Sequence, residues 1–248
     1  MIPETIHYIW FGGNPLSPLA EKCIASWQKY MPEYEIVRWD ESNFDVNCCD
    51  YVREAISAKK WAFASDYARF KILYDNGGVY LDTDVELLKS LDPIVKAGPF
   101  MGCEANSSYS AGESVAPGLG LAANSGLGLY KTILDSYEND HFISGNGVFD
   151  QTTVVVRVTK ILEELGFERR PGIQEVAGIK IYPSEYFCPK DFLTGKIHIT
   201  DNTYSIHHFD GTWAGPFTRF KHKVMRTVGP KGISCFKLIK GNLRSGGQ

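Results

Sequence analysis

The stretch WAFASDYARFKILYDNGGVYLDTDVELL, residues 61–88, decides the fold. Apolar residues spaced three and four apart predict a helix over 60–74, and the paired glycines that follow favour a helix end. The apolar run at 79–81 is typical of a short buried strand. This strand leads directly into Asp82 and Asp84, so the stretch predicts a helix, a buried strand and two carboxylates in succession.

Patterns typical of strands and helices alternate along the rest of the chain. Further strands are predicted at 5–10, 34–39, 100–104, 118–122, 179–182 and 204–209. Further helices are predicted at 18–30, 51–58, 126–137 and 149–165. This alternation predicts an α/β fold with a mostly parallel central sheet flanked by helices. Because no linker or internal repeat precedes residue 229, we expect a single domain over 1–216 and a tail over 217–248.

The charge of the chain is unevenly distributed. The net charge is −3, but residues 217–248 contain eight Lys and Arg and no acidic residue. A basic tail beside an acidic body predicts contact with an anionic membrane surface, and a solvated terminus is the alternative. No motif that reads nucleic acid accompanies the charge, so we expect no nucleic-acid partner.

The chain shows no leader, and no apolar run approaches the roughly 20 residues that span a bilayer. The expected location is therefore the cytoplasm, with peripheral attachment to the inner face of the membrane through the tail. The six cysteines show no C-x-x-C spacing and no zinc-finger pairing with His. We expect them to be small buried side chains in a reducing compartment.

Asp82 and Asp84 form a D-x-D pair at the end of the predicted buried strand. Two carboxylates two residues apart on an extended segment point the same way, and at 4 Å they repel by ~4 kcal/mol in an effective dielectric near 20. A divalent cation removes this repulsion, and Mg²⁺ and Mn²⁺ prefer oxygen ligands that they share with substrate phosphates. Ligands bind at strand ends in α/β sheets. The pair therefore predicts a Mn²⁺ or Mg²⁺ site; two solvated turn aspartates are the alternative.

Other uses of a D-x-D pair are disfavoured. An EF-hand loop would need Gly and Glu where this chain has Leu87 and Pro93. The aspartyl-phosphatase pattern does not tolerate Glu86 two residues after the second Asp. The run Gly118-x-Gly120-x-x-Ala123 superficially matches a dinucleotide fingerprint, but it lacks the downstream acid in a fitting frame.

Residues 61–88 closely resemble glycosyltransferase family 32, whose sugar-binding region contains the DXD motif. They are also similar to the core of the clostridial glucosylating toxins. Three further blocks carry the resemblance: IPETIHYIWFGGNPLSP (2–18), PEYEIVRWDESNFD (32–45) and IHHFDGTW (206–213). The resemblance implies a GT-A type fold and metal-dependent, retaining transfer of a hexose or N-acetylhexosamine from a nucleotide sugar, with uridine favoured as the base.

The resemblance also implies roles for individual residues. The catalytic set would be Asp82, Asp84, Asp66 and Arg69. The donor-binding set would be Ile9, Trp10, Ser65, Asp66, Arg69, Tyr80, Asp82, Thr83 and Trp213. Within it, Trp10 would stack on the base and Trp213 would form part of a lid over the diphosphate. Asp66 and Arg69 lie three residues apart on one helix face and would bind sugar hydroxyls; a structural salt bridge is their alternative.

Two histidines compete to be the third metal ligand. Successive strand residues point to opposite faces, so at most one of His207 and His208 is expected to reach the metal. The HFDG run resembles HF-x-G stretches of related retaining transferases, which favours His208 with His207 as the alternative. An imidazole ligand favours Mn²⁺ over Mg²⁺.

The expected acceptor is a saccharide, lipid-linked, in the synthesis of capsule, O-antigen or another surface polysaccharide. Asn146, Asp150 and Gln151 are candidates for the vicinity of the sugar or the acceptor, and helix capping is the alternative for Asp150. Two other functions stay open. One is a toxin-like transferase that modifies protein side chains, and the other is a catalytically silent module that binds nucleotide sugars or carbohydrates.

Overall fold

The computed structural model describes residues 1–105, 112–191 and 195–211. Its strands are β1 (Thr5–Ile9), β2 (Glu35–Trp39), β3 (Gly78–Tyr80), β4 (Val85–Leu87), β5 (Phe100–Ala105), β6 (Glu113–Val115), β7 (Leu121–Ala123), β8 (Gln174–Val176), β9 (Ile179–Tyr182) and β10 (Ser205–His207). Its helices are α1 (Pro18–Tyr30), α2 (Asp50–Ser57), α3 (Trp61–Asn76), α4 (Asp92–Lys96), α5 (Gly128–Asp135), α6 (Val154–Glu164), α7 (Ser184–Phe187) and the 3₁₀ turn η1 (Pro117–Leu119).

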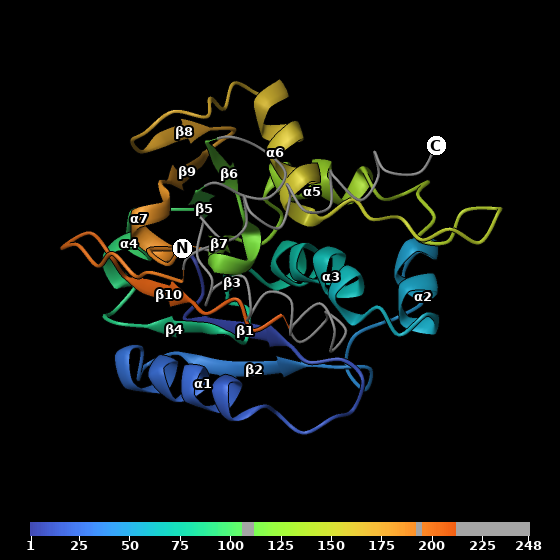
Figure 1. Ribbon diagram of the computed structural model, residues 1–248, viewed down its shortest axis with the longest axis horizontal. Helices are drawn as coiled ribbons and strands as arrows, with labels where there is room; N and C mark the ends of the chain where they lie inside the picture. Colours follow the sequence, from blue (N-terminus) through green and yellow to red (C-terminus); the bar gives the residue numbers. More distant parts are fainter. Residues whose placement is uncertain (106–111, 192–194, 212–248) are drawn as a thin grey trace, which may run out of the picture.

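One eight-stranded sheet forms the centre of the molecule (Figure 1). Its strand order is β2-β1-β3-β7-β5-β9-β8, with β6 beside β5. β1 pairs in parallel with β2 and β3, and β5 pairs in parallel with β9. β7 runs antiparallel between β3 and β5, and β6 and β8 are antiparallel to their neighbours. The sheet is therefore mixed: five strands run in one direction and β6, β7 and β8 run in the other, which confirms the expected α/β class.

Helices pack on both faces of this sheet. Successive strand residues enter different cores, as Tyr80 and Val79 of β3 do. Tyr80 joins the core beneath α2, α3, α5 and α6, which contains Tyr51 and Phe70. Val79 joins the core beneath α1, α4 and α7, which contains Trp27. β3 is thus buried on both sides, and this explains why its residues form an apolar run rather than an alternating pattern.

A second sheet of two strands, β10 and β4, lies beside the central one (Figure 1). The two strands are antiparallel and pair His207 with Val85. Trp27 of α1 donates a hydrogen bond from Nε1 to the Val85 carbonyl at 2.7 Å and so fixes α1 against this sheet. The segment at 205–207 is thereby held next to the residues that directly follow β3.

Local capping explains two element boundaries. α1 begins after Ser17, whose side chain accepts a hydrogen bond from the Ala20 amide at 3.1 Å. The helix predicted from residue 149 begins only at Val154, because Thr153 is its N-cap. The strand predicted at 118–122 is divided into η1 and β7, since the chain turns at Pro117.

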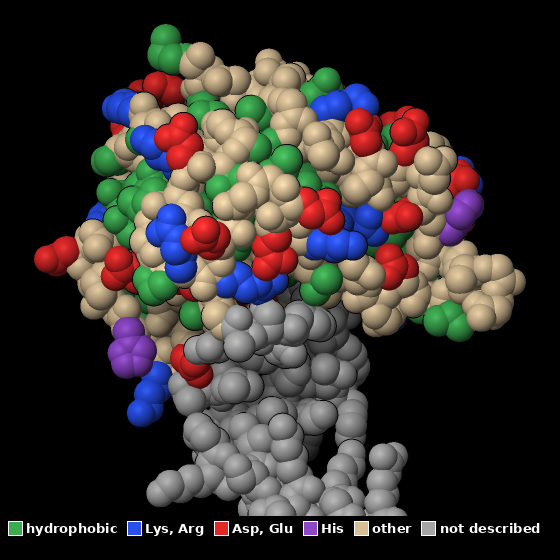
Figure 2. All heavy atoms as spheres, turned by 90° about the horizontal axis from the view of Figure 1, so that it is seen from above, with side chains coloured by type: hydrophobic (Ala, Val, Ile, Leu, Met, Phe, Trp, Pro, Cys, Tyr) green, Lys and Arg blue, Asp and Glu red, His purple; other side chains and the backbone are tan. Residues whose placement is uncertain are grey.

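Among the described residues, no helix has the length and apolar character needed to cross a membrane. The predicted tail over 217–248 lies outside the described residues, as do Thr212 and Trp213. Figure 2 shows one face of the molecule, on which Lys and Arg side chains are interspersed with Asp and Glu side chains. The described part of this face therefore presents a mixed charge pattern.

Candidate active site

Asp82 and Asp84 occupy the turn between β3 and β4. The Asp82 amide donates to the Gly118 carbonyl at 3.0 Å, and the Val85 amide donates to the Asp82 carbonyl at 3.0 Å. These bonds fix the turn against the central sheet at one end and the second sheet at the other. Both aspartates are partly buried, and their side chains are 29% and 18% exposed. The predicted D-x-D pair thus lies in a fixed turn at the end of a buried strand.

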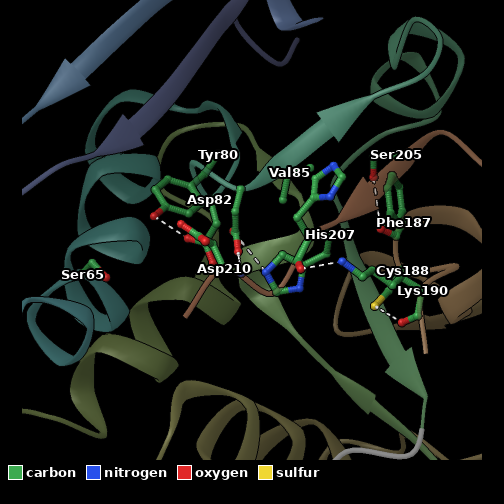
Figure 3. Close-up of polar contacts among 12 residues, drawn as sticks. Ser65, Tyr80, Asp82, Val85, Phe187, Cys188, Lys190, Ser205, His207 and Asp210 are labelled. Atoms are coloured by element: carbon green, nitrogen blue, oxygen red, sulfur yellow. Dashed lines mark hydrogen bonds and ion pairs between the residues drawn. The ribbon is translucent and has the colours of Figure 1, made fainter. Parts of the chain in front are cut away.

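His207 completes a cluster with the two aspartates (Figure 3). One ligand atom from each of Asp82, Asp84 and His207 lies within 4.8 Å of the others. Nε2 of His207 lies 3.1 Å from Oδ1 of Asp84, and the Asp210 amide donates to Oδ2 of Asp84 at 2.9 Å. Two carboxylates and one imidazole therefore converge from β10 and from the turn after β3.

The electrostatics of Asp84 and His207 depend on each other. Burial alone would raise the pKa of Asp84, but the His207 charge and the hydrogen bonds from His207 and the Asp210 amide lower it to about 2. Burial alone would lower the pKa of His207, but Asp84 raises it well above its ordinary value. The pair is consequently an ion pair, in which a positive charge stands beside the carboxylate.

The structure reverses the predicted order of the two histidines. His207, and not His208, lies with the aspartates. Nε2 of His208 lies 2.7 Å from Oε2 of Glu86, which also accepts from Lys22 at 2.8 Å. The reason is strand geometry: the pairing of β10 with β4 turns His207 toward Asp84, and the next side chain points away.

Arg69 of α3 connects the helix to the D-x-D turn. Its Nη2 donates to Oδ1 of Asp66 at 2.8 Å, and its Nη1 lies 3.4 Å from Oδ1 of Asp82. The Tyr80 hydroxyl donates to the same Asp82 oxygen at 2.9 Å, and the guanidinium carbon lies 5.0 Å from the centre of the Tyr80 ring. Arg69 and Tyr80 together therefore hold the Asp82 carboxylate.

Asp66 and Arg69 are both buried, and the Arg69 side chain is 4% exposed. Burial raises the pKa of Asp66 to about 6, although Arg69 acts in the opposite direction. Burial alone would lower the pKa of Arg69, but the negative charge of Asp82 raises it, and the net effect is a rise. The structural salt bridge weighed for these residues is present, and their contact with donor hydroxyls stays a prediction.

The other predicted donor residues differ in burial and in their hydrogen bonds. Ser65 donates from Oγ to the Ala62 carbonyl at 2.7 Å and accepts from Arg69 at 3.4 Å. Thr83 lies between the two aspartates and is partly exposed. Ile9 is buried at the end of β1. Trp10 follows it, is partly buried, and donates from Nε1 to the Asn14 carbonyl at 2.7 Å.

Of the residues predicted near the acceptor, Asn146 lies on a hairpin whose ends pair at Ile143 and Phe149, and Asp150 and Gln151 directly follow it. Asn146 and Gln151 are exposed, and within the described chain no hydrogen bond or ion pair joins them to the aspartate cluster. Oδ1 of Asp150 accepts from the Thr152 amide at 2.8 Å, and Oδ2 lies 3.7 Å from Arg157. Asp150 does not cap α6, because Thr153 occupies that position. Its proposed place near the sugar stays a prediction.

Two residues of the site were not predicted. Gly118 packs directly against the Asp82 carboxylate, where a Cβ atom would lie 2.8 Å from Cγ. In the sequence, its Gly-x-Gly run resembles only a dinucleotide motif. Burial raises the pKa of Glu104 at the end of β5, and the charge of His207 opposes this shift. An isolated Glu in a strand gives no sequence signal that it faces a histidine a hundred residues later.

Residues 17–101 match the family described as a glycosyltransferase sugar-binding region containing a DXD motif. This segment includes α3, β3 and both aspartates. This match, over 85 of the 248 residues, confirms the resemblance to that family that the sequence suggested.

Two relatives each match well under half of the chain. Inositol phosphoceramide mannosyltransferase 3 of Schizosaccharomyces pombe is 32% identical over 101 residues, covering 38% of this chain and 27% of that protein. An uncharacterized glycosyltransferase, L373, of Acanthamoeba polyphaga mimivirus is 30% identical over 113 residues, covering 40% and 42%. The chain thus spans less than half the length of either relative.

Among solved structures, the PaToxG glycosyltransferase has a TM-score of 0.48 at 17% identity, covering 66% of this chain and 69% of that chain. A likeness this loose supports no statement about activity. The likeness to the glycosyltransferase family therefore depends on the sequence match over residues 17–101.

Proposed function

We propose that this chain is a metal-dependent glycosyltransferase that takes a hexose or N-acetylhexosamine from a uridine-linked nucleotide sugar. The acceptor is a saccharide in capsule, O-antigen or another surface polysaccharide, and the anomeric configuration is retained. The observation that carries the proposal is the cluster of Asp82, Asp84 and His207. Both aspartates lie in the segment that matches the glycosyltransferase family, and His207 comes to them from β10.

The three side chains suit a divalent cation. Their ligand atoms lie within 4.8 Å of one another, and they offer two carboxylate oxygens and one imidazole nitrogen. Hard cations prefer the oxygens, and the imidazole favours Mn²⁺ over Mg²⁺. A cation bound there would displace the proton that His207 holds beside Asp84, because only the neutral imidazole can be a ligand. A bound cation would neutralise the charge that develops on the leaving diphosphate.

The chain's own residues prepare the site before a donor binds. Tyr80 and Arg69 hold the Asp82 carboxylate, while the Asp210 amide and His207 hold that of Asp84. Neither carboxylate must therefore be ordered when the donor arrives, which lowers the entropic cost of positioning. In this proposal no carboxylate acts as a covalent nucleophile, and the leaving phosphate accepts the proton of the attacking hydroxyl.

The acceptor part of the proposal has a separate basis. The name of the Schizosaccharomyces pombe relative describes mannosyl transfer to an inositol phosphoceramide, which is a lipid. A lipid-linked saccharide on the inner leaflet is a related kind of acceptor, and the basic segment 217–248 would attach the enzyme to anionic lipids there.

A screen of nucleotide sugars with Mn²⁺ tests the donor. A donor bound only by the folded state raises the unfolding temperature by mass action, so one uridine-linked sugar should stabilise the protein and others should not. If only guanosine-linked mannose stabilised the protein, the proposed uridine-linked donor would be wrong. We expect the protein to transfer or slowly hydrolyse that donor, to lose this activity with a chelator and to regain it with Mn²⁺. Binding of the donor without either reaction would identify a silent binding module.

The acceptor is tested in the same assay. Radiolabel from the donor should enter lipid-linked saccharide and not protein. Label in protein side chains would support the toxin-like alternative. Asp82→Asn and Asp84→Asn should each abolish transfer and keep the circular dichroism spectrum of the parent, and near-normal transfer by both would overturn the metal site.

A further inference from the structure

A cavity of about 230 Å³ lies at the edge of the central sheet. The described residues that line it are Trp39, Asn43, Phe44, Asp45, Cys48, Lys71, Ile72, Asp75 and Asn76. They come from the end of the edge strand β2, from the segment that follows it and from the C-terminal half of α3 (Figure 1). None of these lining residues belongs to the network around Asp82 and Asp84, so the cavity is separate from the candidate active site.

The floor of the cavity is apolar. Phe44 and Ile72 are buried, and the ring of Phe44 lies 5.9 Å from that of Phe11 between centres. Trp39 is partly buried and donates from Nε1 to Nδ1 of His7 at 3.1 Å. Because this bond uses the only polar group of the indole, the ring presents carbon atoms to the cavity. Trp39 therefore provides an aromatic wall that is held in one orientation.

A partly exposed cysteine adds to this wall. Cys48 and its neighbour Cys49 are partly exposed, whereas Cys23, Cys103 and Cys188 are buried. The expectation that the cysteines are buried therefore holds for three of the described five and is wrong for the adjacent pair. A free cysteine behaves as a small hydrophobic side chain, so Cys48 extends the apolar surface beside Trp39.

Polar side chains form the rim of the cavity, and backbone groups orient three of them. The side chain of Asn43 makes two hydrogen bonds to the backbone, of 2.8 and 2.9 Å. Asp45 accepts from a backbone amide at 2.9 Å, and Asn76 donates to a backbone carbonyl at 2.8 Å. A side-chain amide has two N–H groups and a carboxylate has two oxygens, so each of these side chains keeps hydrogen-bonding capacity for a ligand.

The charge and size of the cavity narrow the class of ligand. The rim carries Asp45, Asp75 and Lys71, and Nζ of Lys71 lies 2.8 and 2.6 Å from the two oxygens of Asp75. The lysine is thus already paired, and an anion such as phosphate would meet the charge of Asp45. The volume exceeds what one water needs and is below the roughly 300–1,000 Å³ of pockets for drug-sized ligands. A single uncharged ring with hydroxyl groups fits these conditions.

We propose that this cavity is a second, non-catalytic binding site for one sugar unit of a saccharide. The C–H face of a sugar ring would pack on the Trp39 indole and so remove apolar surface from water. The sugar hydroxyls both donate and accept, and they would bond to the amides and carboxylates of the rim. The source of the sugar rests on the proposed function: the saccharide is the acceptor, and the cavity holds a unit other than the one that is glycosylated.

Nuclear magnetic resonance of the full chain tests this binding without metal or donor. The indole N–H signal of Trp39 is assigned by its loss in Trp39→Phe. It should shift and saturate when glucose, galactose or N-acetylglucosamine is added to millimolar concentrations. The signal of Trp27, which is buried in the other core, should stay in place. Uridine and inorganic phosphate should leave the Trp39 signal unchanged.

Asp75→Ala and Asp135→Ala form a matched pair of variants. Each removes the carboxylate of a Lys–Asp pair with i,i+4 spacing on a helix, and both carboxylates are similarly exposed, at 45% and 46%. Only Asp75 lines the cavity. Asp75→Ala should weaken sugar binding at least about tenfold, because hydrogen bonds to charged groups are stronger than average. Asp135→Ala should bind the sugar as the parent does.

Three results would overturn the proposed site: no shift of the Trp39 signal with any of the three sugars, a shift with uridine in their place, or equal sugar affinity in both variants. The failure of the proposed function is a different result, because it is the absence of transfer from a nucleotide sugar. A protein that binds sugar at Trp39 but transfers none would keep this site and lose the proposed function.

Discussion

The Cα atom of Gly118 lies against the carboxylate of Asp82 so closely that a side chain at position 118 would occupy the same space. A Cβ atom there would be 2.8 Å from Cγ of Asp82 and 3.0 Å from Nη1 of Arg69. The carbonyl of Gly118 also accepts the Asp82 amide at 3.0 Å. Gly118 is not among the residues with positive φ, so the requirement is for space and not for a left-handed backbone.

Replacing Gly118 by Ala should therefore displace the Asp82 carboxylate. We expect the affinity for Mn²⁺ to fall at least about tenfold, the range found when the surroundings of a metal ligand are disturbed. Titration calorimetry or Mn²⁺ paramagnetic resonance measures this directly, without a donor. Gly128→Ala is the matched control, because a Cβ at Gly128 meets open space at the start of α5. Equal Mn²⁺ binding by both variants would contradict the expectation.

The two adjacent histidines should respond differently to substitution. His207→Ala removes an imidazole that lies with both aspartates, and we expect at least about tenfold weaker Mn²⁺ binding. His208→Ala removes a contact to Glu86, which keeps its bond to Lys22, so Mn²⁺ binding should change little. The same titration measures both variants. A larger loss of Mn²⁺ affinity in His208→Ala than in His207→Ala would instead support His208 as the ligand, as the sequence favoured.

Asp82 and Asp84 could be predicted from sequence because their position depends on local pattern. The apolar run at 79–81 indicates a strand buried on both faces, and the carboxylates directly follow it. The family resemblance covers the same residues. The identity of the histidine could not be predicted, because it depends on the register of β10 against β4 and on the turn at Phe209, whose φ is 55°.

Other features depended on contacts distant in sequence. β7 runs antiparallel between β3 and β5 and pairs three residues with the first and two with the second, which is too short for a sequence pattern to show strand direction. Gly118 meets Asp82 only after η1 has folded onto the turn. Helix capping was the sequence alternative for Asp150 alone, and Thr153 is the residue that caps α6.

Arg157 should contribute to stability through a set of contacts at the start of α6. Its Nη1 donates to the Ser136 carbonyl at 2.7 Å, its Nη2 lies 2.6 Å from Asp140, and its guanidinium carbon lies 3.9 Å from the centre of the Tyr137 ring. Its side chain is 13% exposed. Arg157→Met should lower the free energy of unfolding by about 2 kcal/mol, because charged hydrogen bonds are lost and partners are left unpaired.

Urea unfolding measures this loss. Arg170→Met is the matched control, because Arg170 pairs with Glu168 at 2.7 Å in an exposed position, with side chains 58% and 68% exposed. Exposed ion pairs contribute little, so this variant should unfold close to the parent. A loss in Arg170→Met as large as that in Arg157→Met would show that burial is not the cause.

His7 should make the fold sensitive to mild acid. Burial lowers its pKa from 6.5 to about 4, although the hydrogen bond to the Gly77 carbonyl acts against this. Nε2 donates to that carbonyl at 3.0 Å, and Nδ1 accepts from Nε1 of Trp39 at 3.1 Å. A proton on Nδ1 would remove the acceptor that Trp39 uses. The native state therefore holds His7 neutral.

The sign of the pH dependence follows from proton binding. Between pH 6.5 and about 4 the unfolded chain binds a proton at His7 that the native state does not, so stability falls as the pH is lowered through this window. The full loss from this group is roughly 3 kcal/mol. Urea unfolding at pH 7 and pH 4.5 should show a smaller difference in His7→Gln than in the parent. His198→Gln changes an exposed side chain and should show the same difference in unfolding free energy between the two pH values as the parent. If His7→Gln also showed the parent's difference, other groups would be the cause of the acid sensitivity.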